Sequence, residues 1–313
     1  MSIVKVGSLQ VNYDEVKAVD NISFELDEGK IYGFLGPNGS GKTSTIKALA
    51  GVLEPTQGTI TLNGHDLQTD RDKALLKVGY MPDFAPVYEN LKVWEYLDVF
   101  AAAYGMDLAE RQEHVGQWLE KTDLVSKKEA IVKGLSRGMR QRLVFARTLL
   151  SSPDIILLDE PASGLDPISR KNMRDILKEC AARGASILIS SHILSELGEF
   201  VDSLIILEKG RMVIGGSLDD IRAKIGSGKK LTLRFSRSED QDIFTRVLGE
   251  AGIAPDRVRT GQGTVTVTFK QQDGEAADFL KKLMALGVVP QECSITSDDV
   301  EDIFLKVGAR EVA

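Results

Sequence analysis

A glycine-rich segment that ends in a lysine and a threonine is the part of this sequence best suited to chemistry. Its residues are Gly36, Pro37, Asn38, Gly39, Ser40, Gly41, Lys42, Thr43 and Ser44. They match the phosphate-binding pattern G-x-x-x-x-G-K-[ST], in which glycines let backbone N–H groups approach a phosphate and a following helix adds a favourable dipole. Lys42 can place its charge against the β- and γ-phosphates, and the Thr43 hydroxyl can ligate Mg²⁺. The segment therefore predicts a nucleotide-binding loop.

Two neighbouring carboxylates form a second candidate. Asp159 and Glu160 follow the fully apolar run 155–158. A carboxylate at the end of a buried strand, across from a phosphate-binding loop, is placed to hold Mg²⁺ directly or through water. The next carboxylate would polarise an attacking water as general base. Buried strands that end in acids are common, so the pair predicts catalysis only together with the loop.

Strands and helices must bring these residues together. The run 31–35 predicts a buried strand that leads into the glycine-rich turn, and 42–53 predicts a helix. Further predicted strands are 22–26, 58–62, 155–158 and 187–189, and residues 91 to about 150 are mostly helical by their apolar spacing. Short apolar strands that alternate with helices are typical of an α/β core with a parallel sheet.

The pattern restarts after a glycine-containing joint near 225–230. Predicted strands at 231–235, 264–269 and 292–295 and predicted helices at 240–251 and 276–286 form a small α+β domain. We therefore expect a catalytic domain over 1–222 with a helical subdomain at about 85–150, a linker over 223–230, and an accessory domain over 231–313.

Composition narrows the class of protein. With 313 residues the chain is long enough for two domains, and its formal net charge of -7 gives no general attraction to nucleic acid. No apolar run approaches the roughly 20 residues of a membrane helix, and the N-terminus lacks the layout of a secretion signal. We expect a cytoplasmic protein with no nucleic-acid partner, whose membrane role needs another chain.

A series of motifs resembles the ABC ATPase family over about residues 1–222. Residues 135–139 read Leu-Ser-Arg-Gly-Met and are similar to the family signature LSGGQ, with departures at the arginine and the methionine. Ser136 can also cap the following helix. The resemblance implies that Ser136, Gly138 and the helix N-terminus bind the γ-phosphate of a nucleotide held by a second ABC subunit.

The other motifs follow the family's order. Residues 155–160 look like the Walker B strand, and 163–166 look like the D-loop that spans the dimer interface. The resemblance places Asp166, at the end of that loop, among the nucleotide-binding residues. His192 stands where the family has its switch histidine, which contacts the γ-phosphate. Tyr13 stands where the family has an aromatic residue that stacks on adenine; the alternative is a strand tyrosine packed on the core.

One motif departs from the family. In the run 79–83, which reads Gly-Tyr-Met-Pro-Asp, the family usually has glutamine where Asp83 stands. That glutamine meets Mg²⁺ or the attacking water. A carboxylate oxygen can ligate the metal but cannot donate an amide N–H bond. We predict Asp83 as a metal ligand, with a solvent-facing turn residue as the alternative.

The resemblance implies a P-loop NTPase core of ABC type with antiparallel β and helical subdomains, followed by the small α+β domain. It implies an ATPase that uses ATP and Mg²⁺, dimerises with a second ABC subunit and drives a separate integral membrane permease from the cytoplasmic face of the membrane. The motif variants favour the single-module, export-like branch. The alternatives are a soluble ABC ATPase that acts on a ribosome or chromosome, and a nucleotide-dependent regulator.

Overall fold

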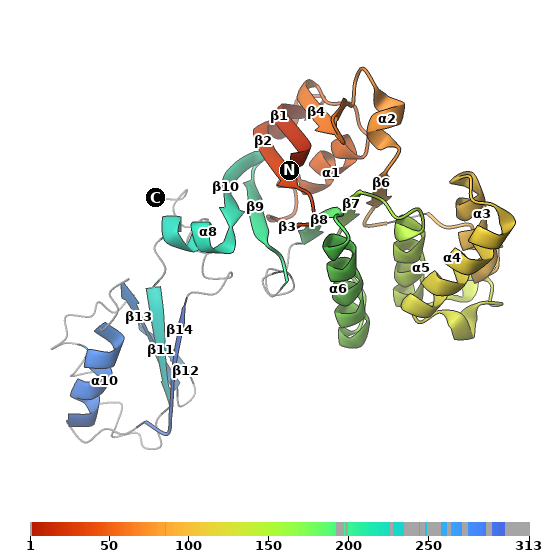
Figure 1. Ribbon diagram of the computed structural model, residues 1–313. Coiled ribbons are helices and arrows are strands. Elements are labelled where there is room, and N and C mark those ends of the chain that lie inside the picture. Colours follow the sequence, from red (N-terminus) through yellow and green to blue (C-terminus); the bar gives the residue numbers. More distant parts are fainter. Residues whose placement is uncertain are drawn as a thin grey trace. The chain divides into compact units, whose positions relative to one another are not determined.

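The structure is a computed structural model that describes residues 2–84, 86–191, 197, 200–225, 228–234, 244, 248, 258–261, 264–270, 275–285 and 290–297. It consists of two compact units, Met1–Ser217 and Leu218–Ala313 (Figure 1).

A six-stranded sheet lies at the centre of the first unit. Its order is β10-β9-β3-β8-β7-β6. The strands are β3 (Ile31–Leu35), β6 (Val78–Met81), β7 (Ile155–Asp159), β8 (Ser186–Ser191), β9 (Ser203–Glu208) and β10 (Arg211–Ser217). All neighbours are parallel except β9 and β10, which form an antiparallel hairpin. Every residue of β3, β7 and β8 is buried, as expected for strands covered on both faces.

An antiparallel sheet of order β2-β1-β4-β5 covers one side of this core. It contains β1 (Ser2–Tyr13), β2 (Val16–Asp27), β4 (Gln57–Leu62) and β5 (His65–Asp66). Buried and exposed residues alternate along β2, because one face packs inward and the other meets solvent. A hydrophobic cluster joins this sheet, helix α1 (Lys42–Leu49) and residues of β3, β7, β8 and β9.

Helices complete the first unit. They are α1 (Lys42–Leu49), α2 (Arg71–Leu75), α3 (Val93–Ala103), α4 (Leu108–Lys121), α5 (Arg137–Leu149) and α6 (Pro167–Ala182), with 3-10 turns at Val125–Lys127 and Val132–Gly134. Helix α1 is shorter than predicted because Gly51, at φ 67°, turns the chain out of the helix. Helices α3, α4 and α5 pack together as the helical subdomain (Figure 1). The predicted α/β core with a mostly parallel sheet is confirmed.

The second unit begins with α8 (Leu218–Ile225) and contains a four-stranded antiparallel sheet of order β12-β13-β11-β14. Its strands are β11 (Gly228–Arg234), β12 (Val258–Gly261), β13 (Thr264–Lys270) and β14 (Glu292–Ser297), and its helix α10 spans Glu275–Ala285. A separate core joins residues of β11, β13 and α10.

Two predictions made from the sequence of this unit differ from the structure or concern residues outside the described ones. The predicted linker 223–230 contains the end of α8 and the start of β11, which makes most of it regular structure. The predicted helix 240–251 lies outside the described residues apart from Phe244 and Leu248, which are both buried. Strand β12 had no sequence signal, since its residues Val-Arg-Thr-Gly show no clear apolar alternation.

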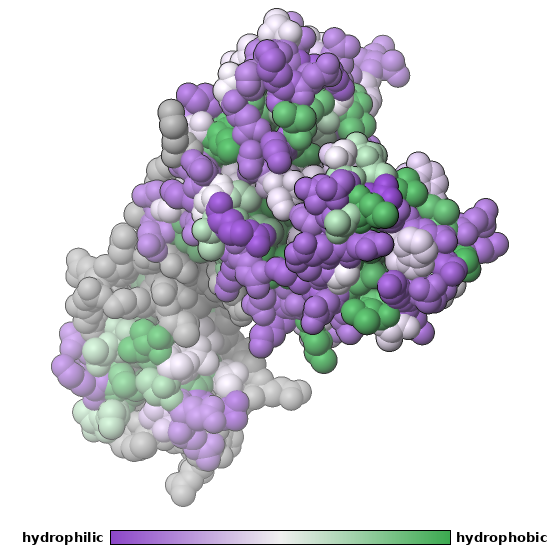
Figure 2. Space-filling view, turned by 45° about the vertical axis from the view of Figure 1, so that its right-hand side comes forward, coloured by the Kyte–Doolittle hydropathy of each residue, from purple (hydrophilic) through white to green (hydrophobic). Residues whose placement is uncertain are grey.

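Among the described residues, no helix is both long enough and apolar enough to cross a membrane. On the face shown in Figure 2, polar side chains dominate and apolar ones lie scattered among them.

Candidate functional site

The phosphate-binding loop leaves the end of β3 and enters α1. Gly41 is the N-cap of α1 at φ 101°, a left-handed conformation that favours glycine. A Cβ on Gly36 would collide with the carbonyl oxygen of Leu207 in β9, and one on Gly41 would collide with the carbonyl oxygen of Ala18 in β2. Both glycines are therefore required by close packing against neighbouring strands.

Lys42 is buried at the start of α1, with 6% of its surface exposed. Its Nζ donates to the carbonyl oxygens of Gly36 at 2.7 Å and Pro37 at 3.2 Å. Burial lowers the pKa of Lys42, while the negative charges of Glu160 and Asp159 oppose that shift. The tertiary structure thus brings the loop lysine close enough to both predicted catalytic carboxylates for their negative charges to act on it.

The two carboxylates follow β7 in the centre of the sheet. Asp159 is 1% exposed, and its Oδ1 accepts a hydrogen bond of 2.6 Å from the Ser190 hydroxyl. Its Oδ2 is buried, and within the described part of the chain it has no hydrogen-bond partner. The backbone N–H of Glu160 donates to the same Ser190 hydroxyl at 2.9 Å.

These residues fit a magnesium ion. A buried carboxylate oxygen without a donor is unfavourable unless another ligand occupies it, and Asp159 Oδ2 is such an oxygen. In the described residues no three His, Cys, Asp or Glu side chains cluster as metal ligands. Mg²⁺ does not need such a cluster, because it usually takes one or two carboxylates and completes its shell with phosphates and water.

A cleft of about 470 Å³ gathers the predicted nucleotide site. Its lining residues are Val16, Lys17, Ala18, Asn38, Gly39, Gly41, Lys42, Thr43, Ser44, Asp83, Glu160 and Lys209. Asp83, which follows β6, therefore faces the same space as the phosphate-binding loop and Glu160. Asp83 is also exposed to solvent, as the alternative of a solvent-facing turn residue requires, so its metal role stays a prediction.

Lys17 and Lys209 were missed by the sequence analysis. Lys209 lies at φ 47° in the turn between β9 and β10, where the neighbouring Gly210 donates its N–H to the carbonyl oxygen of Ser40 at 3.1 Å. That bond fixes the turn against the phosphate-binding loop. Neither lysine belongs to a motif, so only the packing of β2 and of this turn onto the loop could reveal them.

Tyr13 pairs with Val16 where β1 turns into β2. Val16 lines the cleft, whereas Tyr13 is not among the residues that line it and is 44% exposed. The tyrosine is therefore not packed into the core, and its contact with adenine stays a prediction. His192, the predicted switch histidine, lies outside the described residues.

The predicted signature residues lie apart from this cleft. Ser136 is the N-cap of α5, and its Oγ accepts a hydrogen bond of 3.3 Å from the N–H of Met139, which confirms the predicted cap. Neither Ser136 nor Gly138 lines the cleft. Arg137 Nη2 donates to Ser163 Oγ at 3.0 Å, so the signature segment contacts the predicted D-loop of its own chain.

Asp166 is also outside the cleft and caps α6. Its carboxylate accepts hydrogen bonds from the N–H of Ser169 at 2.9 Å and from the Ser169 hydroxyl at 2.8 Å. These two bonds, the backbone bond first, lower the pKa of Asp166. In this chain its carboxylate shapes the D-loop, and its predicted contact with nucleotide stays a prediction.

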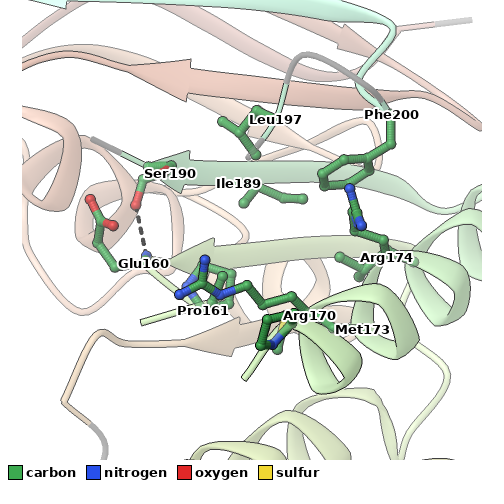
Figure 3. Close-up of a pocket in the computed structure, with 13 residues that line it drawn as sticks. Glu160, Pro161, Arg170, Met173, Arg174, Ile189, Ser190, Leu197 and Phe200 are labelled. Carbon is green, nitrogen blue, oxygen red and sulfur yellow. Dashed lines mark hydrogen bonds between the residues drawn. The ribbon is translucent and has the colours of Figure 1, made fainter. Parts of the chain in front are cut away.

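Glu160 also lines a second cavity, of about 310 Å³ (Figure 3). Its lining includes the apolar side chains of Met173, Ile189 and Phe200, and Arg170 and Arg174 of α6 also face it. Arg170 Nε donates to the Leu165 carbonyl oxygen at 3.0 Å. The cavity is therefore lined by Glu160, by residues of β8 and by residues of α6.

Comparison with known proteins identifies relatives of the whole chain and of its first unit. A family model described as "ABC transporter" matches residues 19–163. Nod factor export ATP-binding protein I of Cupriavidus metallidurans is 34% identical over 99% of this chain and 99% of its own length. An uncharacterized ABC transporter ATP-binding protein of Methanocaldococcus jannaschii is 36% identical over 71% of this chain and 80% of its own length.

Solved structures of ABC transporter subunits confirm the predicted ABC-type fold. A structure described as the ATP binding subunit of an ABC transporter superposes with a TM-score of 0.67 and 32% identity, over 71% of this chain and 93% of that one. The cbiO1 protein of Clostridium perfringens, described as part of the ABC transporter complex cbiONQ, superposes with a TM-score of 0.63 and 26% identity, over 71% of this chain and 91% of that one.

Proposed function

The chain belongs to the ABC transporter family of ATP-binding proteins and is an ATPase, and from this premise we propose that it powers a separate integral membrane permease through ATP-driven dimerisation. Its localisation in this proposal is peripheral, on the cytoplasmic face of the cell membrane. The partner cassette is a second copy of this chain or a sister ATPase.

The phosphate-binding cleft and the signature segment lie at separate places in the chain, and this separation supports the proposal. The cleft holds the phosphate-binding loop, Asp83 and Glu160, but Ser136 and Gly138 do not line it. Ser136 is exposed at the N-terminus of α5, where the helix dipole favours an anion. A second cassette can supply this surface to the γ-phosphate of a nucleotide that lies in the cleft.

In this proposal each side chain of the site has its own role in ATP hydrolysis. Lys42, now bonded to Gly36 and Pro37, exchanges these carbonyl oxygens for the β- and γ-phosphate oxygens of ATP. Thr43, Asp159 and Asp83 hold Mg²⁺ directly or through water. When bound, the ion neutralises charge that develops on the phosphates. Glu160 accepts the proton of the attacking water, and His192 is proposed to contact the γ-phosphate.

The relative that matches over its full length supports an exporter. That protein carries an export name and covers both units of this chain, including the small α+β unit. We assign the chain to an export system on this ground. The substrate is selected by the permease in this proposal, so the residues of this chain do not identify it.

Co-purification from membranes tests the proposal. The full chain, tagged and isolated from cells of its source in mild detergent, is expected to retain one multi-span membrane protein in stoichiometric amount. ATP with vanadate should strengthen the association of two cassettes. Recovery with ribosomes or chromosomal DNA, in the absence of a membrane partner, would overturn the transporter function and favour a soluble ABC ATPase.

A further inference from the structure

One hydroxyl connects both residues of the catalytic acidic pair. Ser190 Oγ donates to Asp159 Oδ1 at 2.6 Å and accepts the backbone N–H of Glu160 at 2.9 Å (Figure 3 shows the second bond). Ser190 lies opposite Asp159 in the parallel pairing of β7 with β8, and it is fully buried. It belongs to none of the motifs described above.

The first bond orients the Asp159 carboxylate. A hydroxyl has a single proton to donate, and here that proton goes to Oδ1. Because the carboxylate is planar, a bond that holds Oδ1 also fixes the direction of Oδ2, the buried oxygen without a partner among the described residues. The oxygen that suits Mg²⁺ is therefore held in place by Ser190.

The second bond holds the backbone of Glu160. This residue has φ 49°, a left-handed conformation that is uncommon for a residue with a Cβ. Such conformations persist when the surrounding structure restrains them, and they occur often at functional sites. The bond from Glu160 N–H to Ser190 restrains the peptide at the point where the chain leaves β7, and so sets the direction of the Glu160 side chain.

Another serine of the same strand shows that burial alone does not require these bonds. Ser186 lies at the beginning of β8, is fully buried, and pairs with Ile155 at the far end of β7. Its hydroxyl has no hydrogen-bond partner in the described part of the chain. The strand thus tolerates a buried serine without such contacts, and the two bonds of Ser190 are specific to the end that carries the acidic pair.

We propose that Ser190 is a positioning residue for ATP hydrolysis, whose hydroxyl aims Asp159 at Mg²⁺ and holds Glu160 in its left-handed conformation. This inference rests on the proposed ATPase site and adds to it a residue that acts through the two carboxylates. It makes two separable claims. Without the Ser190 hydroxyl as a donor to Asp159, metal binding weakens. Without the same hydroxyl as an acceptor for the Glu160 N–H, the chemical step slows.

The metal claim is tested by nucleotide binding without turnover. Isothermal titration with a non-hydrolysable ATP analogue gives one Kd in Mg²⁺ and one in EDTA. The ratio of the Kd in EDTA to the Kd in Mg²⁺ measures the coupling between metal and nucleotide. Ser190→Ala is expected to leave Kd in EDTA within about twofold and to reduce the ratio about tenfold, the lower end for loss of a residue that supports a metal ligand. Ser186→Ala is the matched control and should keep the parent ratio.

The catalytic claim is tested at saturating Mg²⁺ and ATP. There Ser190→Ala should still lower kcat about tenfold or more, because saturating Mg²⁺ fills the metal site but does not restore the bond that holds Glu160. Ser190→Thr and Ser190→Val have the same shape and differ in the hydroxyl, so threonine should restore both readouts and valine should not. This pair also decides the question if the alanine variant folds poorly.

The outcomes separate this inference from the proposed function. A parent protein that neither binds the analogue nor hydrolyses ATP would contradict the function itself. A normal parent with an unchanged Kd ratio and kcat in Ser190→Ala, or with equal losses in Ser186→Ala, would overturn the positioning role alone. Equal behaviour of the threonine and valine variants would overturn it as well.

Discussion

The ammonium of Lys42 lies 2.7 Å from the carbonyl oxygen of Gly36, so the lysine folds back over the loop that precedes its own helix. A second contact, to the Pro37 carbonyl oxygen at 3.2 Å, keeps it there. These bonds satisfy a buried charge. Binding of a phosphate replaces carbonyl partners with charged oxygens, which form stronger hydrogen bonds with the ammonium.

Removal of this ammonium tests the phosphate-binding loop. Lys42→Ala is expected to weaken ATP binding by about 1.5–3 kcal/mol, the range for hydrogen bonds to charged groups, and to reduce hydrolysis to background. Lys47→Ala, which changes a lysine near the other end of α1 that does not line the cleft, is the control. Titration calorimetry measures the ATP affinity and the turnover of each variant. Parent-like affinity and turnover in Lys42→Ala would contradict the proposed site.

Glu160→Gln separates binding from hydrolysis. The amide keeps the shape of the side chain but cannot accept the proton of water, so turnover should be abolished while ATP still binds. The variant should also accumulate as an ATP-stabilised dimer in size-exclusion chromatography with light scattering. Glu25→Gln, at an exposed position of β2, should behave as the parent. Near-normal ATPase activity in Glu160→Gln would exclude Glu160 as general base.

Asp83 predicts a specific dependence on magnesium. If its carboxylate ligates Mg²⁺, Asp83→Ala should raise the Mg²⁺ concentration for half-maximal ATPase about tenfold, and Asp83→Gln should largely restore it. Asp154→Ala removes an exposed carboxylate next to the opposite end of β7 and serves as control. An unchanged Mg²⁺ titration in Asp83→Ala would limit this residue to a surface role in the cleft.

The two compact units predict that the catalytic one folds alone. Its hydrophobic cluster contains only residues of the first unit, and the second unit has a separate cluster. A truncated chain that ends at Ser217 is therefore expected to melt cooperatively and to hydrolyse ATP. A second truncation at Lys224, within α8, controls for the choice of end. Loss of solubility or of nucleotide binding in both would mean that the units depend on each other.

The sequence by itself determined the nucleotide-binding loop and the elements on both sides of it. The residues 36–44 are contiguous, so the chemistry of the loop depends on local order. The strands β3 and β7 were equally clear, because a strand covered on both faces needs an unbroken apolar run and ends where the charged or glycine residues begin. The cap of α5 by Ser136 is local in the same sense.

Only the tertiary structure decided which distant residues meet at that loop. Ser190 becomes a partner of Asp159 through the parallel register of β7 and β8, and Lys209 reaches the cleft through a turn that binds the carbonyl oxygen of Ser40. Neither contact leaves a pattern in the sequence, because a serine or lysine of this kind is unremarkable until another strand is placed beside it. Every residue of β7 and β8 is buried, so neither strand has the apolar–polar alternation that selects a register, and the packing of whole elements decides it.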